Sequence, residues 1–106
     1  MSKILMMTLA ALLVACGVAW AGDAAEGQKK SKACAACHGP DGNSASPEFP
    51  RIAGQHFDYL VMSLTRYKSG KRKNPIMAPQ AANLTRRDIE DLAAYYSQQQ
   101  GLYTKY

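Results

Sequence analysis

Residues that form disulfides or bind metal ions are scarce in this chain, whose 106 residues include three cysteines and two histidines. A disulfide between Cys34 and Cys37 would close almost no loop and would add little stability. A zinc site needs four ligands, and beside Cys34, Cys37 and His38 only His56 stands at a plausible position. The sequence therefore argues against a disulfide scaffold and against a zinc ribbon or finger.

Several larger patterns are missing as well. The chain has no internal repeat, no low-complexity tract and no segment with the two-residue alternation of a strand. Its net charge of +5 comes without a long basic stripe with interleaved aromatics, which argues against a nucleic-acid-binding protein. The N-terminal apolar run, residues 4–14, is too short to span a bilayer. What remains is a small all-α domain.

The most specific pattern in the chain is Cys34-Ala35-Ala36-Cys37-His38. The spacing C-x-x-C-H is typical of a site where haem is attached covalently. Two thiols on one helical turn can each form a thioether with a haem vinyl group, and the adjacent imidazole can bind the iron. A thioredoxin-like redox pair would need a strand–helix–strand setting, which this sequence lacks.

The first 21 residues have the features of a secretory signal peptide. Lys3 supplies a positive start, an apolar run follows, and Ala19-Trp20-Ala21 forms a small-x-small cleavage site. We expect cleavage after Ala21, one domain over residues 22–106 and a periplasmic location. The alternative is a lipobox, Leu13-Val14-Ala15-Cys16, in which Cys16 is lipidated and becomes the N-terminus.

Removing residues 1–21 takes away Lys3 alone among the charged residues, so the net charge falls from +5 to +4. The two propionates of a haem would lower it to about +2. The remaining chain of about 85 residues is near the lower limit for a self-sufficient core. A buried haem would supply the apolar volume that so short a chain lacks.

Three main helices connected by long loops are predicted. The first begins near Ala24 after an Asp23 cap, carries the C-x-x-C-H segment at its end and stops at the turn residues 39–43. The second has its apolar residues at i, i+3, i+4 and i+7 from about Phe57 and ends at Gly70. The third begins at Thr85 with the same periodicity and is closed by Gly101. Residues 44–55 and 71–83 read as loops.

The second axial position of the iron has three candidate ligands in this chain: His56, Met62 and Met77. Met62 lies off the apolar face of its helix, and His56 stands at a helix start, where an exposed or capping histidine is ordinary. Met77 lies between Pro75 and Pro79, which we expect to hold an extended stretch and to present the thioether in a fixed direction. The alternative for Met77 is a buried loop methionine with no ligand role.

The order of several motifs now extends this interpretation to the whole expected domain. They are G-D-A-A-E-G, C-A-A-C-H-G-P-D-G-N-S, F-P-R-I-A-G-Q, Y-K-S-G-K-R and the M-A-P loop before L-T-x-x-D-I-x-x-L-A-A-Y-Y. In this the chain resembles the class I c-type cytochromes, specifically the small bacterial monohaem type similar to cytochrome c-553 and to one half of cytochrome c4. The resemblance implies an all-α cytochrome c fold, with long loops wrapped around one covalently attached haem c.

The resemblance also assigns roles to five residues. It implies that Cys34 and Cys37 hold the thioethers, that His38 and Met77 are the axial iron ligands, and that the Pro50 carbonyl accepts the Nδ1 proton of His38. It further implies that the first and last helices cross closely where Gly27 meets the region of residues 95–96. Only one C-x-x-C-H is present, so this chain alone is not a two-haem cytochrome c4.

An iron with both axial positions filled has no vacancy for a substrate, which predicts a one-electron carrier and not an enzyme. We expect redox protein partners with acidic docking surfaces. A basic ring around Gly70 would attract them; it consists of Lys68, Lys71, Arg72 and Lys73. The alternative is that these residues form an ordinary solvated loop. Membrane contact would come only through partners or through a lipidated Cys16. Two alternatives are a haem c subunit of a periplasmic dehydrogenase or reductase complex, and a gas-binding or peroxidatic haem protein.

Overall fold

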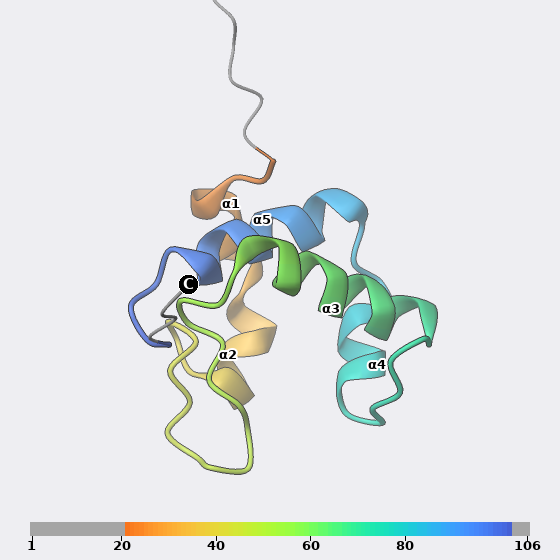
Figure 1. The fold of residues 1–106 in the computed structure, drawn as a ribbon, viewed down its shortest axis with the longest axis horizontal. Helices are drawn as coiled ribbons and strands as arrows, with labels where there is room; N and C mark the ends of the chain where they lie inside the picture. Colours follow the sequence, from red (N-terminus) through yellow and green to blue (C-terminus); the bar gives the residue numbers. More distant parts are fainter. Residues whose placement is uncertain (1–20, 103–106) are drawn as a thin grey trace, which may run out of the picture.

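The computed structural model describes residues 21–102 and contains helices and loops but no strand in that range. The expected all-α class is confirmed. The expected signal peptide, apart from Ala21, and the last four residues lie outside the described residues. Figure 1 shows the helices, whose bounds are α1 Ala24–Lys30, α2 Lys32–His38, α3 Phe57–Ser69, α4 Met77–Ala81 and α5 Arg86–Ser97.

The predicted first helix is divided in two at Ser31. Asp23 caps α1 as expected, since its carboxylate accepts hydrogen bonds from the backbone N–H groups of Ala25 and Glu26. The Ser31 hydroxyl then donates to the Gln28 carbonyl at 2.7 Å, and this local bond competes with the regular helical pattern. The chain resumes as α2 and stops after His38, as the turn residues predicted.

Helix α3 has the predicted bounds, and Gly70 ends it in the left-handed conformation at φ +81°. Helix α5 begins with the predicted capping box, in which the Thr85 hydroxyl accepts from Asp88 N and the Asp88 carboxylate accepts from Thr85 N. It ends at Ser97, so the prediction that Gly101 closes it was wrong.

The segment around Met77 is helical, and the prediction of an extended stretch was wrong. Asn74 explains the difference, because its side-chain oxygen accepts hydrogen bonds from the N–H groups of Ile76 and Met77 at 2.9 and 3.0 Å. Pro79 lies in the first turn of α4, where a missing N–H costs no helical hydrogen bond. The two prolines are therefore compatible with a short helix.

The core lies where α1 and α3 pack on α5 (Figure 1). A buried cluster of α3 and α5 side chains forms its centre: Leu60, Leu92, Ala93, Tyr95 and Tyr96. At Gly27 the backbone of α1 approaches α5 so closely that an added Cβ would overlap the Asp91 carbonyl and lie 2.8 Å from Tyr95 Cβ. The implied close crossing of the first and last helices is present, centred on Asp91 and Tyr95.

Between Ala21 and Leu102, no helix combines the length and the apolar character that a membrane crossing requires.

Candidate functional site

Helix α2 carries the two thiols and the imidazole of the C-x-x-C-H motif. Cys34 and Cys37 are half-buried, and neither takes part in a disulfide. Residues three apart on a helix share a face, so the two thiols are placed to react with one neighbouring group. Burial raises the pKa of the Cys34 thiol, although the Tyr96 hydroxyl beside it partly opposes this.

His38 is buried at the end of α2, and the backbone of the following loop fixes its ring. Its Nδ1 lies 2.8 Å from the carbonyl oxygen of Pro50. A carbonyl can only accept a hydrogen bond, so Nδ1 carries the proton and Nε2 keeps a lone pair. The histidine is thus oriented and offers one nitrogen to a metal.

Met77 is the first residue of α4 and is half-buried. The Asn74 hydrogen bond to its N–H fixes the start of this short helix. His38 and Met77 lie near each other, and α2 and α4 face one another in Figure 1. Met77 thus lies near the helix that carries the C-x-x-C-H motif.

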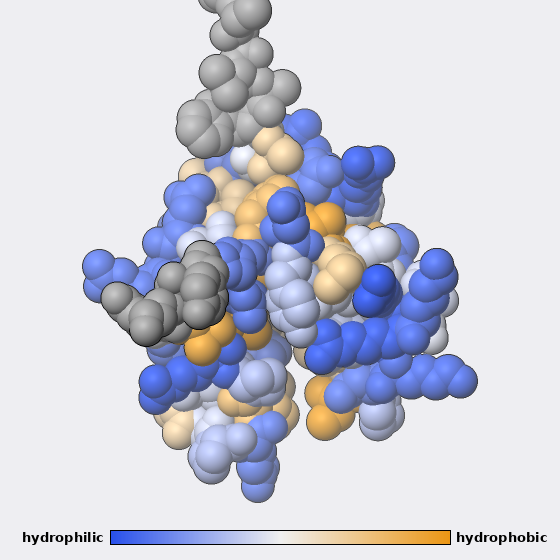
Figure 2. Space-filling view, viewed as in Figure 1, coloured by the Kyte–Doolittle hydropathy of each residue, from blue (hydrophilic) through white to orange (hydrophobic). Residues whose placement is uncertain are grey.

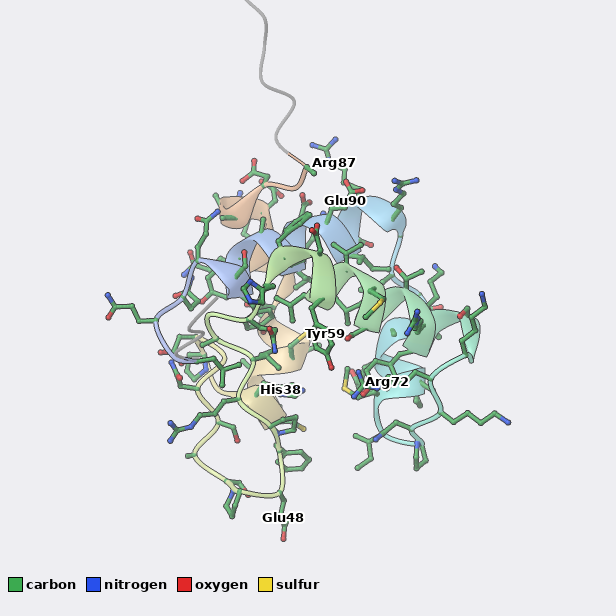
Figure 3. The ribbon with its side chains drawn as sticks, viewed as in Figure 1. His38, Glu48, Tyr59, Arg72, Arg87 and Glu90 are labelled. Atoms are coloured by element: carbon green, nitrogen blue, oxygen red, sulfur yellow. The ribbon has the colours of Figure 1, made fainter. Side chains whose placement is uncertain are left out.

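An opening separates these two helices at the lower edge of the molecule. In Figure 2 it appears as a notch between the part formed by α2 with the loop after it and the part formed by α4, with apolar surface on both sides. Figure 3 shows His38, Tyr59 and Arg72 along this opening. Two other pockets, one between the N-terminal segment and α5 and one within the loop 44–51, do not include the motif cysteines, His38 or Met77.

The two other candidate ligands, His56 and Met62, are both exposed. His56 is exposed at the start of α3, and its side chain makes no capping hydrogen bond. Met62 is 39% exposed.

Two side chains of this region were missed at the sequence level. Arg72, expected only as part of a basic ring, lies across α3: its Nη1 donates to the hydroxyls of Tyr59 and Ser63 at 3.4 and 3.2 Å, and its Cζ lies 4.7 Å from the centre of the Tyr67 ring. This guanidinium lowers the pKa of Tyr59. The other is Tyr96, whose buried hydroxyl lies beside Cys34. Neither spacing nor periodicity points to these contacts, since they join separate elements.

The donor set fits a haem attached through α2. Two free thiols share one helical face, one oriented imidazole offers Nε2, and a methionine lies near that imidazole. In the range 21–102, no three His, Cys, Asp or Glu side chains gather as a metal site of their own.

Comparisons with known proteins show the family of the chain. The cytochrome c family model matches residues 24–100. Cytochrome c4 of Pseudomonas aeruginosa is 48% identical over 79 residues, which are 74% of this chain and 39% of that protein. Cytochrome c-554(548) of Halomonas halodenitrificans is 46% identical over 83 residues, which are 76% of this chain and 100% of that protein.

A solved structure shares the fold. The reduced recombinant cytochrome c4 from Pseudomonas stutzeri has a TM-score of 0.74 and 44% sequence identity, over 77% of this chain and 48% of that one. The chain thus spans half or less of these cytochromes c4, but the full length of cytochrome c-554(548). A less similar relative, 37% identical over 70 residues, is the cytochrome subunit of sulfide dehydrogenase of Chlorobaculum tepidum. With a family match over most of its length, the chain belongs to the cytochrome c family, whose cofactor is covalently bound haem c.

Proposed function

We propose that this protein is a one-electron carrier whose haem c is attached through Cys34 and Cys37 and ligated by His38 and Met77. Each thiol would add across one vinyl double bond: the sulfur bonds to one carbon, the hydrogen goes to the other, and no oxidant or reductant is consumed. When bound, the haem supplies an iron that exchanges one electron between its ferrous and ferric states.

The hydrogen bond between His38 and Pro50 is the observation that carries this proposal. It fixes the imidazole tautomer with Nε2 free, which is the state that a metal ligand requires. It also increases the basicity of the ligating nitrogen and prevents rotation of the ring. A histidine that only packed in the core would not require a free Nε2 beside two cysteines that form no disulfide.

Met77 decides between a carrier and an enzyme. A thioether opposite His38 would occupy the position at which a substrate or dioxygen would bind, and methionine ligation raises the reduction potential. The ligands then need little rearrangement between the two oxidation states. The gas-binding or peroxidatic alternative requires Met77 to be away from the iron.

Two measurements on the exported protein, produced where the haem maturation machinery is present, test this function. Mass spectrometry should find the polypeptide plus the mass of one haem, resistant to acid–acetone extraction. The reduced native protein should not bind carbon monoxide, because the methionine blocks access. Bare polypeptide would refute the cofactor assignment, and rapid carbon monoxide binding would refute the carrier assignment.

A second candidate function is that of a haem c subunit in a periplasmic dehydrogenase or reductase complex. It is favoured by the similarity to the cytochrome subunit of sulfide dehydrogenase. Size-exclusion chromatography of the native protein from its own cells distinguishes the two functions. A free carrier elutes alone, whereas a subunit elutes with a second, catalytic polypeptide.

The proposed location is the periplasm, with residues 1–21 removed and residues 22–106 as the mature domain. Its partners would be redox proteins with acidic docking surfaces, which the basic residues 68–73 would attract. The mass of the mature protein tests the cleavage site. A chain that begins at Gly22 supports the signal peptide, while a lipid on Cys16 supports a membrane-anchored form.

A further inference from the structure

Tyr96 holds the one buried side-chain oxygen or nitrogen in residues 21–102 that lacks a hydrogen-bond partner. The residue is 3% exposed. Its neighbour Tyr95 is 7% exposed and donates its hydroxyl to the Pro40 carbonyl at 2.8 Å. A buried hydroxyl without a partner is costly, so the Tyr96 hydroxyl requires an explanation.

The ring of Tyr96 is fixed, so its hydroxyl cannot turn toward solvent. Its centre lies 5.0 Å from that of Tyr95 at an interplanar angle of 58°. Gly42 also borders the ring, since an added Cβ there would lie 2.8 Å from Tyr96 Cδ1. The hydroxyl must therefore find its partner among its present neighbours.

Two polar groups lie beside this hydroxyl, the Cys34 thiol and the Ser31 hydroxyl. Cys34 packs against the core cluster that contains Tyr96. Ser31 already donates its proton to the Gln28 carbonyl at 2.7 Å. A thiol can donate or accept weakly, but a thioether sulfur has lost its proton and can only accept. Attachment at Cys34 would thus leave Tyr96 as the only donor of this pair.

We propose that Tyr96 is a positioning residue whose hydroxyl donates a hydrogen bond to the Cys34 sulfur once that sulfur has formed its thioether with the haem. This hydrogen bond would fix the orientation of the thioether. The inference rests on the proposed function, specifically on attachment at Cys34. It gives Cys34 a role beyond attachment, because the Tyr96 hydroxyl lies beside this cysteine. The positive end of the hydroxyl dipole would also point toward the haem and favour the ferrous state.

The sign of one stability change tests this inference in the haem-loaded protein. If the hydrogen bond exists, Y96F lowers the equilibrium constant for folding about fivefold. If the hydroxyl has no partner, Y96F leaves this constant unchanged or raises it, which overturns the inference. Y95F is the matched control, since it removes a hydroxyl of similar burial that serves a backbone carbonyl.

The reduction potential separates positioning of the thioether from a purely structural role. Y96F should lower the reduction potential. Y95F should destabilise the protein but leave its reduction potential unchanged. In a C34A background, which leaves the single attachment at Cys37, Y96F should cause no further loss of stability; a persistent loss would assign the bond to Ser31 or a buried water and would overturn the inference. If C34A yields no holoprotein, the inference is decided by two measurements on the Y96F single variant: the sign of its stability change and its reduction potential. A wild-type protein without haem mass would instead refute the proposed function itself.

Discussion

The two proposed axial ligands are oriented by quite different means. His38 depends on a backbone carbonyl, which any residue at position 50 would provide, so the proline matters through the path of the loop. The position of Met77 depends on a side chain, because the side-chain amide oxygen of Asn74 fixes the start of α4. The methionine side is therefore the one that single substitutions can loosen.

Substitution of Met77 should change the oxidised spectrum in a specific way. In M77A the far-red absorption band that arises from the methionine–iron bond should disappear, and the reduced protein should bind carbon monoxide. M62A is the matched control, because Met62 is 39% exposed on α3 and should leave the band unchanged. Loss of the band in M62A with retention in M77A would contradict the ligand assignment.

Asn74 offers a milder change on the same side. N74A removes the acceptor for two N–H groups at the start of α4, which should cost about 1 kcal/mol of stability. The methionine should then leave the iron at a lower pH in an alkaline titration of the oxidised protein. N83A, an exposed asparagine in the loop after α4, should titrate like the wild type. Equal titrations of N74A and wild type would show that the cap does not hold the ligand.

Helix positions and types were largely predictable, because caps and apolar periodicity are local signals: Asp23, Thr85 and Gly70 act as expected. The errors have local causes too. At Ser31 and Asn74 a side chain bonds to nearby backbone, which divides one predicted helix and creates another. The contacts of Tyr96 and Arg72 were not predictable, since they depend on how separate helices pack.

The crossing of α1 and α5 should be sensitive to a single methyl group. G27A places a Cβ against the Asp91 carbonyl and should cost about 3 kcal/mol, because backbone cannot yield as a flexible side chain can. G70A has no neighbour within 4 Å but must adopt φ +81°, which should cost about 1 kcal/mol. Urea midpoints measure both. A smaller loss in G27A than in G70A would contradict the close crossing.

The same crossing contains an ion pair between a half-buried lysine and a buried aspartate, and this pair should make stability depend on acid. Asp91 is 1% exposed; burial alone would raise its pKa, but the Lys30 ammonium at 2.5 Å and the Asp23 N–H outweigh burial and lower it. The Thr85 N–H and then Lys30 lower the pKa of Asp88 to about 2. Both folded-state pKa values lie below the unfolded ones, so this stabilisation is present at neutral pH and is lost as pH falls from about 4 toward 2.

Lys30 and Lys29 provide a matched pair for that test. K30M leaves the Asp91 carboxylate buried without its cation and should clearly destabilise the protein at pH 7. K29M removes an exposed pair with Glu26 on the same helix and should change little. Denaturant unfolding between pH 2 and 7 should show the K30M deficit shrinking as the pH falls. A deficit that does not depend on pH would mean that packing, and not charge, holds the helices together.

Charge is the property of the whole molecule that bears on its proposed partners. Three basic side chains come directly after α3 in the sequence (Lys71, Arg72 and Lys73). The acidic groups of α5 pair instead with cations, Asp88 and Asp91 with Lys30 and Glu90 with Arg86, so the uncompensated positive charge lies after α3. Figure 3 shows Arg72 at the opening and Glu90 at the far end of the molecule. An anionic partner should therefore be drawn to the side on which the haem would lie.

Electron exchange with small charged reagents tests this polarity without a natural partner. Oxidation of the reduced protein by an anionic iron cyanide complex should slow as salt is added, because screening at about 0.1 M ionic strength acts over roughly 10 Å. A cationic cobalt complex should show the opposite dependence. Replacing Lys71 by glutamate should weaken the salt dependence with the anionic reagent more than K29E does, although both change the net charge equally. Lys71 is the sequence neighbour of Arg72, which lies at the opening, whereas Lys29 lies on α1, so equal effects of the two variants would show that net charge alone governs the approach.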